Sequence, residues 1–128
     1  MANWTPDGFA GQMFKAAGKY LPPPNMPPPV LWGVEDTVRE RFGDAVSSLN
    51  MTKRMAEISY EFPPVEVVEF FRTYFGPVQM AFKALEDDQT KQDGYRNDLE
   101  GLWAEYNQHD DDTTHIEGEY LEVVAVKA

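Results

Sequence analysis

The side chains best suited to chemistry in this 128-residue chain gather in one short segment near its C-terminus. His109 and His115 are the only two histidines, and they flank the three consecutive aspartates 110–112. Imidazole and carboxylate groups bind zinc or manganese, so the segment is a candidate metal site. Its spacing is irregular, however, and adjacent aspartates point in different directions, which is more typical of a solvated acidic loop. We therefore predict no metal site in this segment.

The sequence offers little support for other catalytic arrangements. The chain has no cysteine, which excludes a thiolate nucleophile and a cysteine–zinc site. Ser47 and Ser48 lie outside any nucleophile-elbow motif and have no histidine context, so a hydrolase triad is not supported. Alternating strand positions carry carboxylates that we expect to face solvent: Glu57, Glu61, Glu119 and Glu122. The residues alone therefore leave the catalytic group unknown.

A nucleotide-like cofactor usually needs a glycine-rich turn between a strand and a helix, where the backbone can approach the ligand closely. Gly8 and Gly11 are the closest glycine pair, but they lie inside a predicted helix, and no G-x-G pattern occurs anywhere. No predicted strand ends in an acidic residue that could hold ribose hydroxyls after such a turn. We therefore predict that this chain alone binds no cofactor.

The composition limits the classes of partner. The net charge is −11, so a phosphate backbone or an anionic membrane surface would be repelled. No signal peptide or long apolar run is evident, and we expect a cytoplasmic protein without a membrane contact. The hydrophobic fraction of 42% and the length favour a single domain, 1–128, with a packed core.

The elements that must position any site are organised around residues 53–77. Apolar residues alternate with polar ones up to Phe62, which predicts a strand with one buried face within residues 46–62. Pro63 and Pro64 end this strand, and Pro64 is well placed to start a helix. Gly76 and Pro77 end that helix and start another.

Further elements follow from local signals elsewhere. Thr5 is a predicted N-cap for a first helix, and Gly43 is the predicted stop of a short helix that begins at Val34. A longer helix is expected from about 91 to 108. The apolar run Tyr120–Val126 predicts a strand buried on both faces. Residues 22–30 form a proline-rich linker, or a lid over a pocket.

Three stretches carry a resemblance to a known family. They read "ANWTPDGFAGQMFK" (2–15), "YEFPPVEVVEFFRTYFGPV" (60–78) and "GEYLEVVAVKA" (118–128). In this order they resemble the C-terminal half of small-molecule class I methyltransferases that use S-adenosylmethionine. The resemblance covers nearly all of the chain and carries no information about the substrate.

The resemblance implies an α+β fold in which helices pack on a small, mainly antiparallel sheet. This fold is equivalent to the C-terminal half of a doubly wound, Rossmann-like methyltransferase. The final strand is expected to insert between the equivalents of the fifth and sixth strands, antiparallel to residues 53–62. In that family the cofactor-binding elements precede the part that this chain resembles. S-adenosylmethionine would then bind only if a complementary half is supplied.

The resemblance also suggests substrate-binding residues. Asn3 and Trp4 match the segment that leaves the fifth strand, where the carboxyl ends of strands border the ligand crevice. An apolar substrate wall would come from four further side chains: Phe14, Tyr20, Trp32 and Tyr74. Each of these rings is also a candidate for a core or lid position.

Three readings of the function remain open at this point. The first is a methyltransferase-related protein that supplies the substrate-side half of the fold and is not catalytic alone. The second is a stand-alone module that binds a small apolar ligand or another protein, and the third is a gene fragment. The final strand has only the short stub 1–4 as its second neighbour, so we expect a homodimer or a complementary methyltransferase subunit as partner.

Overall fold

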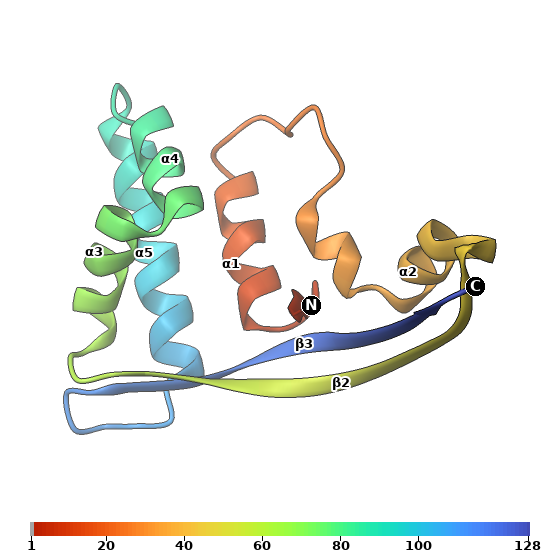
Figure 1. Ribbon diagram of the computed structural model, residues 1–128. Coiled ribbons are helices and arrows are strands. Elements are labelled where there is room, and N and C mark those ends of the chain that lie inside the picture. The colour runs from red at the N-terminus through yellow and green to blue at the C-terminus, as the bar shows by residue number, and fades with distance from the viewer. Residues whose placement is uncertain (1) are drawn as a thin grey trace. The chain divides into compact units, whose positions relative to one another are not determined.

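The computed structural model, drawn as a ribbon in Figure 1, describes residues 2–128. The chain divides into two compact units. The first unit contains the residues up to Gln12 together with Pro24–Ala56 and Gly118–Ala128, and the second contains Met13–Pro23 and Glu57–Glu117. The first helix and both long strands contribute residues to each unit. Neither unit is therefore one continuous stretch of chain.

The described residues form an α+β fold with five α-helices, two short 3-10 helices and one three-stranded sheet. The elements in chain order are β1 (Ala2–Trp4), α1 (Phe9–Gly18), η1 (Pro29–Gly33), α2 (Glu35–Phe42), η2 (Gly43–Ala45), β2 (Val46–Tyr60), α3 (Pro64–Tyr74), α4 (Gly76–Ala84), α5 (Gln89–Tyr106) and β3 (Thr114–Lys127). The expected fold class, helices with a small antiparallel sheet, is confirmed.

The sheet has the strand order β1-β3-β2, so the final strand of the chain lies in the middle. β1 runs antiparallel to β3, with Asn3 opposite Leu121. β2 also runs antiparallel to β3, because Ser47 hydrogen-bonds the carbonyl of Val126 while Ser59 contacts His115 at the other end. The two predicted strands are thus neighbours, as the sequence led us to expect.

The sequence predicted the extent of β2 but misjudged the extent and the environment of β3. β2 spans Val46–Tyr60, within the residues 46–62 expected to hold this strand, whereas β3 begins at Thr114 rather than Tyr120. The prediction that Tyr120–Val126 is buried on both faces is wrong, because Val124 and Val126 are each 52% exposed. Leu121 is the last fully buried residue of the strand, Glu122 and Val123 are half-buried, and the residues from Val124 to Lys127 are exposed.

Thr5 does not cap the first helix, which contradicts the sequence prediction. Its N–H donates to the Glu119 carbonyl (3.1 Å), which extends the β1–β3 ladder by one residue. Its hydroxyl donates to Glu119 Oε1 at 2.8 Å. The helix starts only at Phe9, after a turn closed by a hydrogen bond from the Gly8 N–H to the Thr5 carbonyl. The hydroxyl of Thr5 therefore bonds to Glu119 on the neighbouring strand instead of capping helix α1.

The core of the second unit is a three-helix packing of α3, α4 and α5. Helix α5 buries Tyr95, Leu99 and Trp103, whose spacing of four places them on one face. Trp103 meets Phe71 of α3 edge-on at 5.0 Å between ring centroids, and Tyr95 meets Phe82 of α4 at 4.9 Å. The helix expected from about 91 to 108 is confirmed, and these three positions form its buried face.

The first unit places η1 directly against β1. A side chain at Gly33 would bring its Cβ to 2.1 Å from the Trp4 carbonyl oxygen, so the backbones approach as closely as glycine permits. Helix α2 buries Val38 completely and ends at Gly43, whose φ of 49° suits glycine. Residues 22–28 form neither helix nor strand.

Within residues 2–128, no helix combines the length and the apolar character needed to cross a membrane.

Candidate functional site

Asn3 is the most unusual polar side chain of the first unit. It is 7% exposed, and its Nδ2 has no hydrogen-bond partner within the described chain. The cause lies in the sheet register, because Asn3 stands opposite Leu121, whose side chain is fully buried and apolar. A buried amide N–H without an acceptor costs about 1–3 kcal/mol. The amide is therefore a donor available to an oxygen atom of a ligand or a water molecule.

Trp4 and Trp32 are both held by neighbours in this unit. The Trp4 ring meets Tyr120 edge-on at 6.3 Å and lies so close to Gly118 that a Cβ there would come within 2.9 Å of the indole. The Trp32 ring carries the Arg41 guanidinium 4.3 Å above it, a cation–π contact. Both indoles thus have aromatic or cationic neighbours within this unit.

Tyr20 forms a hydrogen-bonded contact with α5 in the second unit. Its hydroxyl donates to Asp98 Oδ2 at 2.7 Å, and Lys19 Nζ lies 3.4 Å from the same oxygen. The hydrogen bond to Asp98, followed by burial, raises the pKa of Tyr20. Phe14 lies half-buried on α1. The ring of Tyr20 packs against Tyr95, so its role here is to hold the end of α1.

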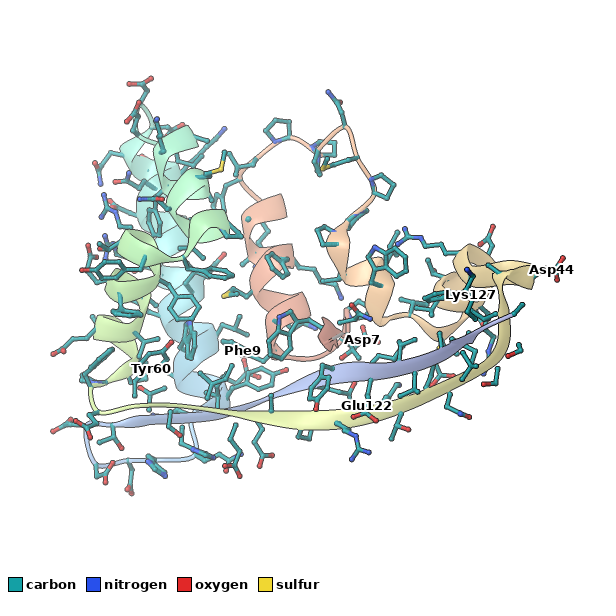
Figure 2. The ribbon with its side chains drawn as sticks, viewed as in Figure 1. Asp7, Phe9, Asp44, Tyr60, Glu122 and Lys127 are labelled. Atoms are coloured by element: carbon teal, nitrogen blue, oxygen red, sulfur yellow. The ribbon has the colours of Figure 1, made fainter. Side chains whose placement is uncertain are left out.

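Tyr74 lies in an open groove of about 370 Å³ on the surface of α3. The groove is lined by three aromatic rings, a threonine and two glutamates: Phe62, Phe70, Tyr74, Thr73, Glu66 and Glu69. Tyr74 is 73% exposed, and its ring lies 4.9 Å from that of Phe70. Tyr60, labelled in Figure 2, extends the cluster at 5.6 Å from Phe70. We call this surface the aromatic groove.

The acidic residues of the aromatic groove differ in their partners. Glu69 Oε2 lies 2.7 Å from Arg96 Nη1 and 54% of its side chain is exposed. The hydrogen bond from Arg96 lowers the pKa of Glu69 below its ordinary value. Glu66 forms no ion pair with any residue of the described chain. The groove therefore carries one unneutralised carboxylate beside its aromatic wall.

The structure divides the six predicted substrate-binding residues between the two units. Asn3, Trp4 and Trp32 belong to the first unit, and Phe14, Tyr20 and Tyr74 belong to the second. Within the second unit, Tyr20 and Tyr74 have different partners and do not share a site. Sequence reasoning missed the aromatic groove as a unit. The available signal was the exposed pair Phe70 and Tyr74, one helical turn apart on α3.

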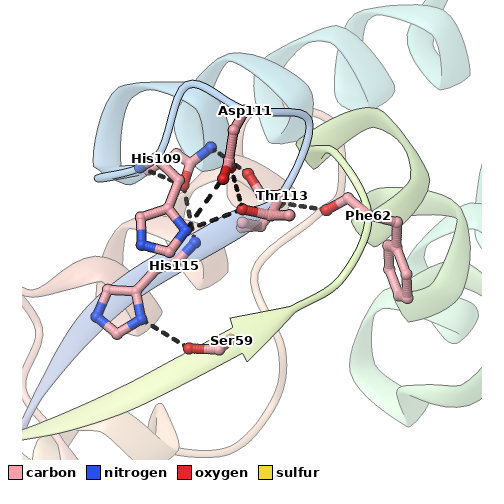
Figure 3. A network of polar contacts seen from close by, with 8 residues as sticks. Ser59, Phe62, His109, Asp111, Thr113 and His115 are labelled. Atoms are coloured by element: carbon pink, nitrogen blue, oxygen red, sulfur yellow. Dashed lines mark hydrogen bonds and ion pairs between the residues drawn. The ribbon is translucent and has the colours of Figure 1, made fainter.

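The acidic loop between α5 and β3 is organised by hydrogen bonds among its own residues (Figure 3). The Asn107 side chain accepts from the His115 N–H at 2.8 Å, and the Thr113 hydroxyl donates to the Asp111 carboxylate. That hydrogen bond lowers the pKa of Asp111. The His109 and His115 rings are stacked with 5.2 Å between centroids. Residues 108–112 are exposed, and their carboxylates do not converge on one point with both histidines.

Comparisons with known proteins identify similar sequences without a described activity. The uncharacterised proteins Rv1403c of Mycobacterium tuberculosis and Mb1438c of Mycobacterium bovis are each 32% identical to this chain over 87 residues. The match covers 66% of this chain and 32% of each relative, so it spans about a third of the relatives' length. No family model and no solved structure matches the chain.

Proposed function

We propose that this chain supplies the substrate-side half of an S-adenosylmethionine-dependent methyltransferase fold and is not catalytic alone. The observation that supports the proposal is the strand order β1-β3-β2, in which the final strand is antiparallel and lies between the other two. The resemblance of three sequence stretches implies the same order. The helix pair α3 and α4 follows β2 at the paired prolines, as in the resembled segment.

The cofactor-gripping elements would come from another segment of a longer polypeptide or from a partner subunit. Methyl transfer needs the sulfonium held in line with the accepting atom. The residues described here lack the glycine-rich turn that approaches a nucleoside. The relatives are about three times as long as the matched segment, which leaves room in them for such elements.

Asn3 is the residue we assign to substrate or cofactor contact in this arrangement. Its amide nitrogen is buried and unpartnered within residues 2–128, and Asn3 lies on β1, which would be the counterpart of the fifth strand in the proposed fold. An oxygen acceptor on the bound molecule would satisfy it and remove the cost of burying a free donor. Trp4, fixed between Tyr120 and Gly118, would hold the adjacent backbone in place.

Calorimetric titration with S-adenosylmethionine tests this proposal. We expect no binding by this chain alone and binding by full-length Rv1403c, with ATP as the control ligand for each. Micromolar binding with turnover by this chain alone would overturn the claim that it is not catalytic. Failure of Rv1403c to bind S-adenosylmethionine would remove the relative as support for the methyltransferase assignment and count against it.

A second candidate function is favoured by the aromatic groove. Its exposed rings and the unneutralised Glu66 suit a small ligand with an apolar body and a cationic amine, because cations are attracted to aromatic faces and to carboxylates. An NMR titration would compare phenethylamine with its neutral analogue phenylethanol. We expect the amine to shift the ring signals of Phe70 and Tyr74 more than the neutral analogue does. Tyr74→Ala should abolish the shift of the Phe70 signal. Met80→Ala, on the exposed surface of α4, should leave the shifts unchanged. Equal responses to both compounds would exclude a cation site.

A further inference from the structure

The second unit brings together three metal-ligating side chains that the sequence does not place side by side. Glu57 of β2 and His115 and Glu117 of β3 each offer one ligand atom, and these atoms all lie within 4.8 Å of one another. We propose that this trio binds a divalent transition-metal ion of the Zn²⁺ type. This site differs from the acidic loop, because none of the three consecutive aspartates belongs to it.

Strand geometry explains why these residues converge. Alternate residues of a strand face the same side, so His115 and Glu117 share one face of β3, and Glu57 and Ser59 share one face of β2. The contact between Ser59 Oγ and His115 Nδ1, at 2.6 Å, fixes the register of the two strands on this face (Figure 3). Glu57 then lies across from Glu117. The site is therefore built on two adjacent strands rather than on a loop.

The charges at the trio favour a bound cation. Neither Glu57 nor Glu117 forms an ion pair with any residue from 2 to 128. Like charges on neighbouring strands repel, and this is destabilising unless a cation lies between them. Ligand bonds to zinc of about 2.0–2.2 Å place the ligand atoms roughly 3.3 Å apart. Rotation of the glutamate side chains would bring the three ligand atoms to this separation. The side chain of Glu57 is exposed and has room to rotate.

The orientation of His115 is already restricted. The hydrogen bond to Ser59 occupies Nδ1 and leaves Nε2, which we assign as the ligand atom. Metal-ligating histidines commonly use their second nitrogen in this way, because the outer hydrogen bond fixes the tautomer and the ring.

The donor set indicates the kind of ion and the openness of the site. One imidazole and two carboxylates suit zinc or manganese better than calcium or a soft ion, and the chain has no thiolate to compete. Three protein ligands leave a fourth position for water, as in open zinc sites. Glu57 is exposed and the other two side chains are half-buried, so an ion can enter from solvent.

Titration of Zn²⁺ into the chelator-treated, full chain tests the proposal by calorimetry. We expect the chain to bind one ion and His115→Gln to abolish binding. Glu57→Gln and Glu117→Gln should each lower the affinity for Zn²⁺ by about tenfold or more. Ser59→Ala, which removes the group that orients the ring, should weaken binding about tenfold. Two matched controls should retain the affinity: His109→Gln, which changes the other histidine, and Glu61→Gln, which removes a nearby exposed carboxylate.

Nitrogen-15 spectra of the two imidazoles provide a readout that is independent of affinity. We expect Zn²⁺ to shift Nε2 of His115 and to leave the nitrogens of His109 in place. Circular dichroism of each variant checks that the strands still form. The proposal is overturned by absence of binding at millimolar Zn²⁺, by binding that survives Glu57→Gln and Glu117→Gln, or by a loss in His109→Gln, which would assign the ion to the acidic loop.

Discussion

The two halves of β3 differ in apolar content, and the more apolar half is the more exposed. In the half that belongs to the second unit, Thr114 and Ile116 are buried and alternate with half-buried polar residues. In the half that belongs to the first unit, Val124 and Val126 are exposed, although the sequence there is almost continuously apolar. Burial therefore follows the elements that cover a strand and not its hydrophobicity alone. The exposed half is an apolar edge without a described neighbour beyond Glu122 on the β1 side.

The largest contrast in stability is expected when one apolar side chain in each half of β3 is shortened to alanine. Ile116→Ala removes a fully buried side chain and should lower the free energy of unfolding by about 2–5 kcal/mol. Val126→Ala, at a half-exposed position, should change it by less than about 0.5 kcal/mol. Urea denaturation measures both. Equal losses would show that the second half of β3 is covered in solution.

A polar change in the buried half sharpens the comparison. Thr114 is 1% exposed, and its hydroxyl donates to the Phe62 carbonyl at 2.8 Å. Thr114→Val keeps the shape but leaves that carbonyl without its donor, which should cost about 1–3 kcal/mol. Ser47→Ala, which removes an exposed hydroxyl at the other end of the strand pair, is the matched control and should be nearly neutral.

The ion pair beside the aromatic groove gives a smaller, pH-dependent effect. Arg96 lowers the folded-state pKa of Glu69 below its ordinary value of 4.5. The pair therefore stabilises the fold above that value, and the stabilisation is lost as the pH falls through the folded-state pKa. Because both side chains are partly exposed, Arg96→Gln should cost no more than about 1 kcal/mol at neutral pH. Urea titrations at several pH values should show the difference from the unchanged protein vanish in acid.

The smallest effect on stability is expected at the exposed edge, where the effect on association should be visible instead. Val124→Lys and Val126→Lys place charge on an apolar edge, which natural proteins use to prevent strand pairing. We expect unfolding free energies within about 0.5 kcal/mol of the unchanged chain. If a second copy pairs with this edge, light scattering should show a dimer that both substitutions dissociate. A monomer at high concentration before substitution would contradict the expected homodimer.

Local signals in the sequence predicted the helix boundaries well. Pro64 starts α3, Gly76 starts α4 and Gly43 ends α2, because proline and glycine restrict or permit particular backbone angles independently of distant residues. The same reasoning failed at Thr5, where a sheet partner more than a hundred residues away accepts the hydroxyl hydrogen bond. Long-range pairing outcompetes local propensity at such positions.

The candidate sites depend on pairing that no local pattern contains. The alternation from Thr114 to Glu119 is a strand signal, but the apolar run predicts a strand only from Tyr120. Without that strand, the register that brings Glu57 to His115 and Glu117 could not be derived. Asn3 was selected from the family resemblance, whereas its burial without a partner follows from its position opposite Leu121.

The shared strands have a practical consequence for anyone who would study the parts separately. Because α1, β2 and β3 each contribute residues to both units, no single cut in the chain yields either unit as a complete fragment. An expression clone of 57–117, for example, would omit the 13–23 segment and with it the Tyr20–Asp98 hydrogen bond. Truncated fragments of this protein would therefore lack part of their packing contacts, and point substitutions are better suited to study each unit.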